Sequence, residues 1–335
     1  MRTKYLTAAG VVMAFVTGLG IYSATARVLP VTAALSPQDC DRYSGLPQGF
    51  GADPLAGMLA VPAGHFTPGS NDGYADERPA GAVQIDAFMI DRTEVTNAQF
   101  AAFIDATGYI TEAEREGGAV VFQAPEEGVT VQYNGWWRFQ KGANWRHPEG
   151  PNSHLEGRDN HPVVQVTEKD ALAYAHWLGR ELPNEAQWEW AALGGGDQEQ
   201  LEREPRSDDG KASANYWQGV FPYINTAEDG FIHRSPVGCY PANGYGLNDM
   251  IGNVWEWTTD PYLGPRQYHG NGDPASILSK GATDQAYKVI KGGSFLCAKD
   301  YCVRYRTSAR YPQEANLGVA HVGFRTVLNL KSEQQ

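Results

Sequence analysis

Two cysteines, Cys297 and Cys302, are the residues of this chain best suited to chemistry. They lie five positions apart in a segment rich in aromatic and basic residues, Lys291-Gly-Gly-Ser-Phe-Leu-Cys-Ala-Lys-Asp-Tyr-Cys-Val-Arg-Tyr-Arg306. On an ideal helix this spacing turns the side chains about 140° apart, and on a strand an odd spacing places them on opposite faces. If the sulfurs meet, an irregular loop must hold them. Two such thiols can form a structural disulfide, form a redox-active pair, or bind a thiophilic metal.

The composition limits which partners this chain can have. Its 335 residues suit one large domain or two small ones, and its formal net charge is −12. We expect no nucleic acid among its partners, because proteins that bind nucleic acids usually present a basic face. Glycine and proline are abundant, with 38 and 20 residues. This abundance favours a compact fold rich in irregular backbone.

The N-terminus has the features of a bacterial export signal. Arg2 and Lys4 precede an uncharged apolar run from Leu6 to about Ile21, and small residues follow at positions 24–26. We therefore expect residues 1–26 to be a signal peptide or an uncleaved membrane anchor, since the apolar run is near the lower length limit for spanning a bilayer. The expected location is periplasmic or secreted, with membrane attachment only if the segment stays uncleaved.

Four cysteines in an exported protein invite disulfide pairing. Three connectivities are possible. The simplest joins Cys40 to Cys239 and leaves Cys297 and Cys302 to each other or to a metal. The alternative is that Cys40 and Cys239 stay unpaired.

Few segments carry strong signals of regular structure. Apolar residues recur at helical spacing over 96–106, and the capping pairs Thr167 with Asp170 and Asn184 with Gln187 predict the start of two further helices. Short alternating runs such as 82–90 indicate strands. The charged stretch 194–211 is interpreted as a solvated loop without chemistry. We expect residues 27–55 to be a tether and residues 56–330 to be the folded part of the chain.

Short motifs extend through most of that folded part. They are Lys141-Gly-Ala-Asn-Trp-Arg-His-Pro-Glu-Gly-Pro151, Ala214-Asn-Tyr-Trp-Gln-Gly219, Asn243-Gly-Tyr-Gly-Leu247, Gly252-Asn-Val-Trp-Glu-Trp257, and Gly292-Gly-Ser294 followed by Cys297, Tyr301-Cys302 and Arg304-Tyr-Arg306. With these motifs the chain resembles the formylglycine-generating enzymes, also called sulfatase-modifying factors. The resemblance implies that residues 56–330 form a single irregular α+β domain with the C-type-lectin-like fold of that family, built from few helices, short strands and many loops.

The resemblance also implies an activity. In the family the two cysteines bind Cu(I), a role that falls here to Cys297 and Cys302, and soft thiolates do select this ion. The family uses O2 to convert a cysteine of an unfolded or nascent sulfatase, usually within Cys-x-Pro-x-Arg, to Cα-formylglycine. Ser294 and Trp255 match positions beside the copper and are expected to shape the pocket for O2 and substrate. Core packing is an equal alternative for Trp255.

Three further residues are expected to contact the substrate, namely Tyr301, Arg304 and His321. Arg304 could equally form a structural ion pair. His321 stands where the family usually has asparagine, in a segment, 312–322, that departs from the family's groove sequence. The aromatic-Trp-Gly segment that is common in the family is also replaced here, by the charged stretch from Gly194. The cysteine pair is therefore preserved, while the preference for Cys-x-Pro-x-Arg is less secure.

Two calcium ions complete what the resemblance implies. The expected ligands of the first are the side chains of Asn215 and Asp229 with the carbonyls of Tyr216 and Phe231, and those of the second are the side chains of Asp249 and Glu256 with the carbonyls of Gly252 and Val254. Oxygen ligands of this mixed kind suit Ca²⁺.

Two other functions stay open at the level of sequence. One is a non-catalytic C-type-lectin-like binding module in which Cys297 and Cys302 form a disulfide. The other is a sibling oxidase that acts on a different peptide.

Overall fold

The computed structural model describes residues 40–330 except positions 80, 127, 128, 130, 131, 133 and 267–286. Contacts between Cα atoms divide the chain after Ala33, so every described residue belongs to one unit. The signal peptide or anchor expected over residues 1–26 lies outside the described residues. Among the described helices, none is both long enough and apolar enough to cross a membrane.

Three of the described helices begin where the sequence predicts them. The described α-helices are α1 (Asn97–Thr107), α2 (Glu112–Glu116), α3 (Glu168–Trp177), α4 (Glu185–Leu193) and α5 (Gln198–Leu201), and short 3₁₀ turns are η1 (Cys40–Arg42) and η2 (Ala75–Glu77). The three predicted helices are α1, α3 and α4. Thr96, Thr167 and Asn184 cap them, and each cap side chain accepts a hydrogen bond from the backbone N–H three residues later.

Within the described residues, the strands form two larger sheets and three hairpins. The three-stranded sheet has the order β1 (Met58–Val61), β4 (Phe88–Asp91), β13 (Val327–Asn329), and the four-stranded sheet has the order β11 (Arg310–Glu314), β10 (Tyr287–Lys291), β9 (Trp255–Pro261), β12 (Val322–Gly323). The hairpins are β2 (Gly64–Phe66) with β3 (Val83–Ile85), β5 (Gly118–Phe122) with β6 (Trp137–Lys141), and β7 (Gly219–Val220) with β8 (Ile224–Asn225). Among the strand pairs of the described residues, only β12 and β9 are parallel.

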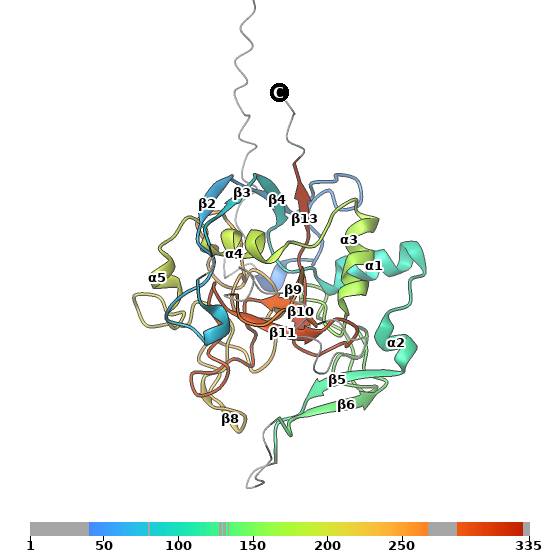
Figure 1. Cartoon of the computed structure of the whole chain (residues 1–335). Helices are drawn as coiled ribbons and strands as arrows, with labels where there is room; N and C mark the ends of the chain where they lie inside the picture. Colours follow the sequence, from blue (N-terminus) through green and yellow to red (C-terminus); the bar gives the residue numbers. More distant parts are fainter. Residues whose placement is uncertain are drawn as a thin grey trace, which may run out of the picture. The chain divides into compact units, whose positions relative to one another are not determined.

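Helices cover the central four-stranded sheet. Helices α3 and α4 both contact β9, α4 also contacts β10, and α1 packs on α3 (Figure 1). Aromatic rings fill the space between them, with Phe100 5.3 Å from Trp145 and Tyr174 5.3 Å from Phe324 between ring centroids. The expected α+β class is therefore confirmed.

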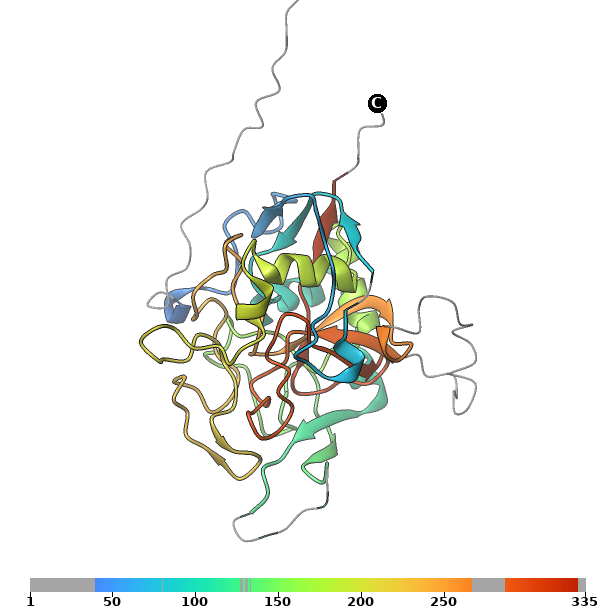
Figure 2. The ribbon, with the colours of Figure 1, turned by 60° about the vertical axis from the view of Figure 1, so that its left-hand side comes forward.

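Long loops and two hairpins occupy one end of the domain. Figures 1 and 2 both place β5–β6 and β7–β8 at the end opposite β13. The loop that carries the two candidate cysteines leaves the sheet at the end of β10 and returns to it at β11. Its ends are thus fixed by neighbouring strands, while its middle is free to adopt irregular backbone.

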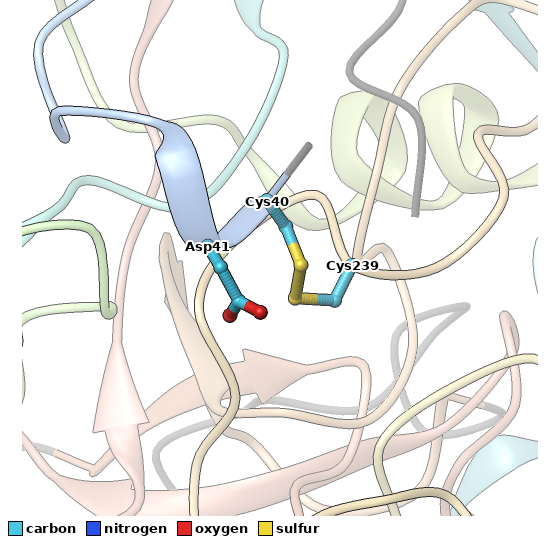
Figure 3. Close-up of side chains that lie close together, drawn as sticks. All are labelled: Cys40, Asp41 and Cys239. Carbon is cyan, nitrogen blue, oxygen red and sulfur yellow. A yellow bond between two sulfur atoms is a disulfide. The ribbon is translucent and has the colours of Figure 1, made fainter. Parts of the chain in front are cut away.

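The expected tether over residues 27–55 needs correction for its described part. Cys40 is buried and forms a disulfide with Cys239, the pairing that the sequence favoured (Figure 3). The buried guanidinium of Arg180 donates hydrogen bonds to the carbonyls of Pro54 and Ala56. Residues 40–55 therefore belong to the folded domain. Composition misses this boundary because the attachments come from residues far away in the sequence.

The charged stretch 194–211 also needs correction, because it is not solvated throughout. It contains α5 and buries the carboxylate of Glu202, whose side chain is 2% exposed. Glu202 forms an ion pair with Arg306 at 2.8 Å. A loop that appears purely solvated by composition thus reaches the segment that carries the two cysteines.

Candidate functional site

A tight turn brings Cys297 and Cys302 together. The N–H of Ala298 donates to the carbonyl of Tyr301 at 2.7 Å, and the N–H of Tyr301 donates back to the carbonyl of Ala298 at 3.2 Å. The two cysteines flank this turn as opposing residues flank the turn of a hairpin. Their Sγ atoms lie 2.6 Å apart, and both are free thiols. This geometry confirms the prediction that an irregular loop holds the two thiols together.

Two glycines allow the cysteine loop to leave the sheet so sharply. Gly292 and Gly293 have φ angles of +92° and +76°. A Cβ on Gly292 would lie 2.9 Å from the carbonyl oxygen of Met250, and one on Gly293 would lie 2.6 Å from that of Arg304. Only glycine tolerates both the backbone conformation and the close contact. The Gly-Gly-Ser motif is therefore required by the path of the backbone.

The two thiols have unequal acidity. Burial raises the pKa of the Cys297 thiol, but the hydrogen bond with Cys302, backbone N–H groups and the nearby charge of Arg304 outweigh burial and leave this pKa lowered. The pKa of Cys302 is raised, first by the same hydrogen bond and then by burial. Of the two thiols, Cys297 is therefore the one that loses its proton more readily. Thiolates are the form in which cysteines bind metals.

Ser294 contacts Cys297 directly, whereas Trp255 belongs to the large hydrophobic cluster in which both cysteines lie. The carbonyl of Ser294 accepts a hydrogen bond from the N–H of Cys297 at 2.9 Å, and Ser294 is fully buried. Trp255 belongs to the same buried hydrophobic cluster as Cys297, and its ring lies 6.0 Å from that of Tyr311. Ser294 thus orients the backbone of one cysteine, and Trp255 contributes to the apolar surroundings of the pair.

Tyr301 belongs to an aromatic cluster beside the two cysteines. Its ring stacks on Phe221 at 4.2 Å and meets Trp136 edge-on at 5.4 Å. Phe221 belongs to the loop between β7 and β8, and the N–H of Trp217, just before β7, donates to the carbonyl of Cys297 at 2.9 Å. The β7–β8 hairpin is therefore attached to the cysteine turn by both rings and backbone.

Arg304 is held by acidic residues. Its guanidinium contacts Asp76 at 3.1 Å and Glu77 at 2.8 Å, and it lies 4.2 Å above the ring of Tyr74. This geometry favours the structural ion pair over direct substrate binding. Arg304 still acts on the site, because its charge lowers the pKa of Cys297.

His321 lies on the ring of Trp137, with 4.6 Å between ring centroids. Its Nδ1 atom is buried without a hydrogen-bond partner among the described residues, and its carbonyl accepts from the N–H of Trp255. Burial first, and then the charge of Arg234, lowers the pKa of His321 to about 3. This side chain is therefore a neutral imidazole at every pH at which proteins usually work.

Replacing His321 by asparagine is expected to flatten the dependence of stability on pH. The folded pKa, about 3, lies below the unfolded value of about 6.5. Between these values the unfolded chain binds a proton that the folded protein excludes, so stability falls as pH decreases. From pH 8 to pH 5 the wild type should lose about 2 kcal/mol more free energy of unfolding than H321N. Urea unfolding at several pH values measures this difference, and parallel curves for the two proteins would contradict it.

The residues expected at the first calcium ion are gathered in one place. The carboxylate of Asp229 accepts hydrogen bonds from the N–H of Tyr216 and from the N–H of Phe231, both at 3.0 Å. Asn215 is buried and donates to the carbonyl of His233 at 2.9 Å. Burial raises the pKa of Asp229. One carboxylate, one amide and neighbouring carbonyls of this kind fit a hard cation.

The second expected set is more strongly acidic than the sequence indicates. Both oxygens of Glu256 accept from Arg325 at 2.7 Å. Asp249 is buried with one carboxylate oxygen unpartnered among the described residues, and burial raises its pKa to about 6. Glu94, which the sequence does not single out, is fully buried with both carboxylate oxygens unpartnered there. The Glu256–Arg325 ion pair acts electrostatically on both Glu94 and Asp249, so this part of the chain holds more acidic than basic groups, an excess that a divalent cation would neutralise.

A polar cavity lies beside the cysteine turn. Its volume is about 330 Å³, and its walls include Trp217 and Lys299, the latter within the turn itself. Glu204, Arg206 and Glu228 supply charge to the same walls, and Arg206 pairs with both glutamates. Glu204 and Arg206 come from the charged stretch 194–211. This stretch therefore helps to form the surface around the candidate site.

Fold and site together define a class of protein, an α+β domain with little regular structure that holds two adjacent free thiols in a buried loop. A family model described as "Sulfatase-modifying factor enzyme 1-like domain" matches residues 44–330. The chain belongs to the formylglycine-generating enzyme, or sulfatase-modifying factor, family and has the C-type-lectin-like fold of that family.

Named relatives support this membership. The chain is 43% identical over 296 residues to the formylglycine-generating enzyme of Mycobacterium tuberculosis, covering 82% of this chain and 98% of the relative. It is 44% identical over 284 residues to that of Thermomonospora curvata, covering 80% and 92%. Among solved structures, PvdO from Pseudomonas aeruginosa is similar with a TM-score of 0.52 and 24% identity, over 82% of this chain and 94% of PvdO. At that identity the likeness shows the fold alone.

Proposed function

We propose that this protein is an oxidoreductase that uses copper and O2 to convert a cysteine of a sulfatase to Cα-formylglycine. The observation that carries the proposal is the pair of adjacent free thiols at Cys297 and Cys302, in a chain 43–44% identical to proteins named formylglycine-generating enzyme. The expected substrate is an unfolded or nascent sulfatase with a Cys-x-Pro-x-Arg segment.

The residues present fit Cu(I). Cys297 and Cys302 offer two soft sulfur ligands at one point, and two thiolates leave a position for the substrate's own thiolate. Bound there, copper would supply, together with O2, the oxidising capacity for removing hydrogen from the substrate Cβ. The buried surroundings of Cys297 exclude water from the sulfur, and the charge of Arg304 stabilises the thiolate.

The decisive experiment offers the purified protein, Cu(I) and O2 to a Cys-x-Pro-x-Arg peptide. We expect aldehyde formation that mass spectrometry detects and that depends on copper. Absence of turnover at every copper concentration would rule out the assignment of this substrate.

A sibling oxidase that acts on a different peptide is the second candidate. Two observations favour it, the neutral imidazole of His321 at a position where the family usually has asparagine, and the charged cavity lined by Glu204 and Arg206. A library of cysteine peptides with varied flanks separates the two candidates by the ranking of kcat/KM. The remaining alternative, a binding module with a Cys297–Cys302 disulfide, requires that the native protein titrate no free thiols.

We also propose that the protein is exported to the periplasm or beyond the cell, and that it stays on the membrane only if residues 1–26 are retained. The Cys40–Cys239 disulfide supports an oxidising compartment. Cell fractionation with N-terminal sequencing of the mature protein tests this. A cytosolic protein that retains Met1 would contradict the proposal.

We further propose that the two acidic loops bind Ca²⁺, with Asn215, Tyr216, Asp229 and Phe231 at one ion and Asp249, Gly252, Val254 and Glu256 at the other. The unpartnered carboxylate of Glu94 supports the second of these sites and adds a ligand to it. Calcium would neutralise the buried carboxylates, whose mutual repulsion otherwise opposes folding.

Replacing Glu94 by glutamine is expected to weaken calcium binding about tenfold or more, because one of three negative charges is lost from a buried site. Calorimetric titration of the metal-depleted protein measures the affinity, and calcium should raise the melting temperature of E94Q less than that of the wild type. Glu116 is an exposed glutamate, so E116Q is the control. Equal calcium affinity in E94Q and the wild type would remove Glu94 from the ligand set.

A further inference from the structure

A buried cluster of charged side chains lies directly behind the cysteine turn. It consists of Asp76, Glu77, Glu202, Arg304 and Arg306, which we name the arginine clamp. Its members come from three segments far apart in the sequence: η2, the end of α5, and the irregular segment that follows Cys302. Burying charged groups costs free energy, so each charged side chain of the cluster needs well-placed partners of opposite charge.

The carboxylates of the clamp bridge the two arginines. Glu77 accepts from Arg304 at 2.8 Å and from Arg306 at 2.5 Å through different oxygens, and Glu202 accepts from the other end of the Arg306 guanidinium at 2.8 Å. The side chains of Glu77, Glu202 and Arg306 are 0%, 2% and 4% exposed. With both ends of its guanidinium held by buried carboxylates, Arg306 has one fixed position.

Hydrogen bonds connect the fixed side chain of Arg306 to the backbone beside Cys302. Its Nε atom donates to the carbonyl of Val303 at 2.7 Å, and the N–H of Arg304 donates to the carbonyl of Cys302 at 2.5 Å. Cys302 itself has a φ of +51°, the left-handed conformation that residues with a Cβ rarely adopt. Surrounding contacts must impose such a conformation.

Glu202 holds the chain on the far side of Arg306 as well. Its carboxylate accepts from the N–H and hydroxyl of Ser308 at 3.1 and 2.5 Å and from the hydroxyl of Thr307 at 3.0 Å. One carboxylate from the charged stretch 194–211 thus fixes three consecutive residues that follow the cysteine turn.

We propose that Glu202, acting with Glu77 through Arg306, is a positioning residue that keeps Cys302 in its left-handed turn with its sulfur beside that of Cys297. The proposal rests on the proposed function in so far as this sulfur pair is the copper site. The positioning role comes from a loop that carries the charged sequence of this chain in place of the aromatic-Trp-Gly segment common in its family.

The test compares E202Q with E199Q in the metal-free full chain. Glu199 lies one turn away on α5, is 75% exposed, and pairs only loosely with Arg203 at 3.6 Å, so E199Q is a matched control. A disulfide reagent such as 5,5′-dithiobis(2-nitrobenzoate) modifies one thiol, and the second thiolate then displaces the nitrobenzoate thiolate and closes the Cys297–Cys302 bond. The rate of this closure reports how close the two sulfurs are held.

We expect closure in E202Q to be at least tenfold slower than in the wild type and in E199Q, and Cu(I) affinity, measured by competition with a chelator, to fall by a similar factor. The variant E202D retains the negative charge, so its closure rate and its Cu(I) affinity should lie between those of E202Q and those of the wild type. If Glu202 only stabilises the fold, E202Q should have a lower melting temperature than the wild type. At temperatures well below that melting temperature, its closure rate and its Cu(I) affinity should then equal those of the wild type. Closure and Cu(I) affinity within twofold of the wild type would overturn the proposal.

Two further comparisons keep the outcome decisive. If E202Q does not fold, S308A removes one hydrogen bond to Glu202 and leaves the ion pair, and it should slow closure by a smaller factor. An S308A closure rate equal to that of the wild type then counts against the clamp. If the wild type binds no Cu(I), the proposed function fails, whereas the closure rate of the metal-free protein still tests the clamp.

Discussion

Serine in place of Cys297 or Cys302 is expected to abolish formylglycine formation, with a loss of about 10³-fold or more in kcat/KM, as when one member of a unit that acts together is removed. A hydroxyl has nearly the shape of a thiol, but it is not a soft ligand and does not ionise near neutral pH. The fold should therefore tolerate the change, while a two-thiolate site cannot form.

Three measurements check this prediction in each variant. Peptide conversion should disappear, bound Cu(I) should fall below one equivalent, and the melting temperature should stay close to that of the wild type. The unequal acidity of the pair adds a finer expectation for the metal-free protein. In C302S the pKa of the Cys297 thiol should be higher than in the wild type, because burial raises this pKa and the hydrogen bond from Cys302, the largest effect that lowers it, is lost. Retained turnover in either variant would exclude the two-thiolate site.

Removal of the Cys40–Cys239 disulfide should have the opposite effect, lowering stability while leaving activity intact. The variant C40A/C239A is expected to lose about 3–5 kcal/mol of unfolding free energy while it keeps peptide conversion at temperatures below its own unfolding. The Cys40–Cys239 bond spans 199 residues. Breaking a disulfide increases the conformational entropy of the unfolded chain, and the increase is larger when the bond closes a longer loop.

Denaturant unfolding with and without a reductant measures this loss. Asn160 donates a hydrogen bond to the carbonyl of Cys40 at 2.8 Å without using either sulfur, so the N-terminal turn should keep its place in the folded variant. The wild type serves as its own control, because reduction should destabilise it by the same amount and leave C40A/C239A unaffected. Loss of activity without loss of stability would show that this pair belongs to the chemistry instead.

The contrast between the two cysteine pairs shows how much of the structure could be predicted from the sequence. Helix starts could be predicted because their signals are local: Thr167 caps α3 through Asp170, three residues away. The spacing of Cys297 and Cys302 required an irregular loop if the two sulfurs were to meet, and Gly292 and Gly293 supply the bends of that loop. The resemblance added the chemistry of the pair and the family membership that the comparisons confirm.

Tertiary structure decided the placement of charge. Glu202 looks like one acid among many in a solvated stretch, yet it is buried against Arg306, 104 residues away. Glu94 looks like an ordinary turn residue ahead of α1, and Cys40 looks like part of a tether. In each case a local pattern could not reveal the partner, because it comes from another part of the chain.

The sequence by itself therefore determined which atoms can react, since it contains the two thiols of Cys297 and Cys302 and the glycines Gly292 and Gly293 that bend the loop between them and the sheet. What holds those atoms in one geometry was decided only by the fold. Burying a carboxylate or a guanidinium is favourable only when its counterpart arrives from elsewhere, so the positions of such groups depend on long-range packing and cannot be obtained from local sequence.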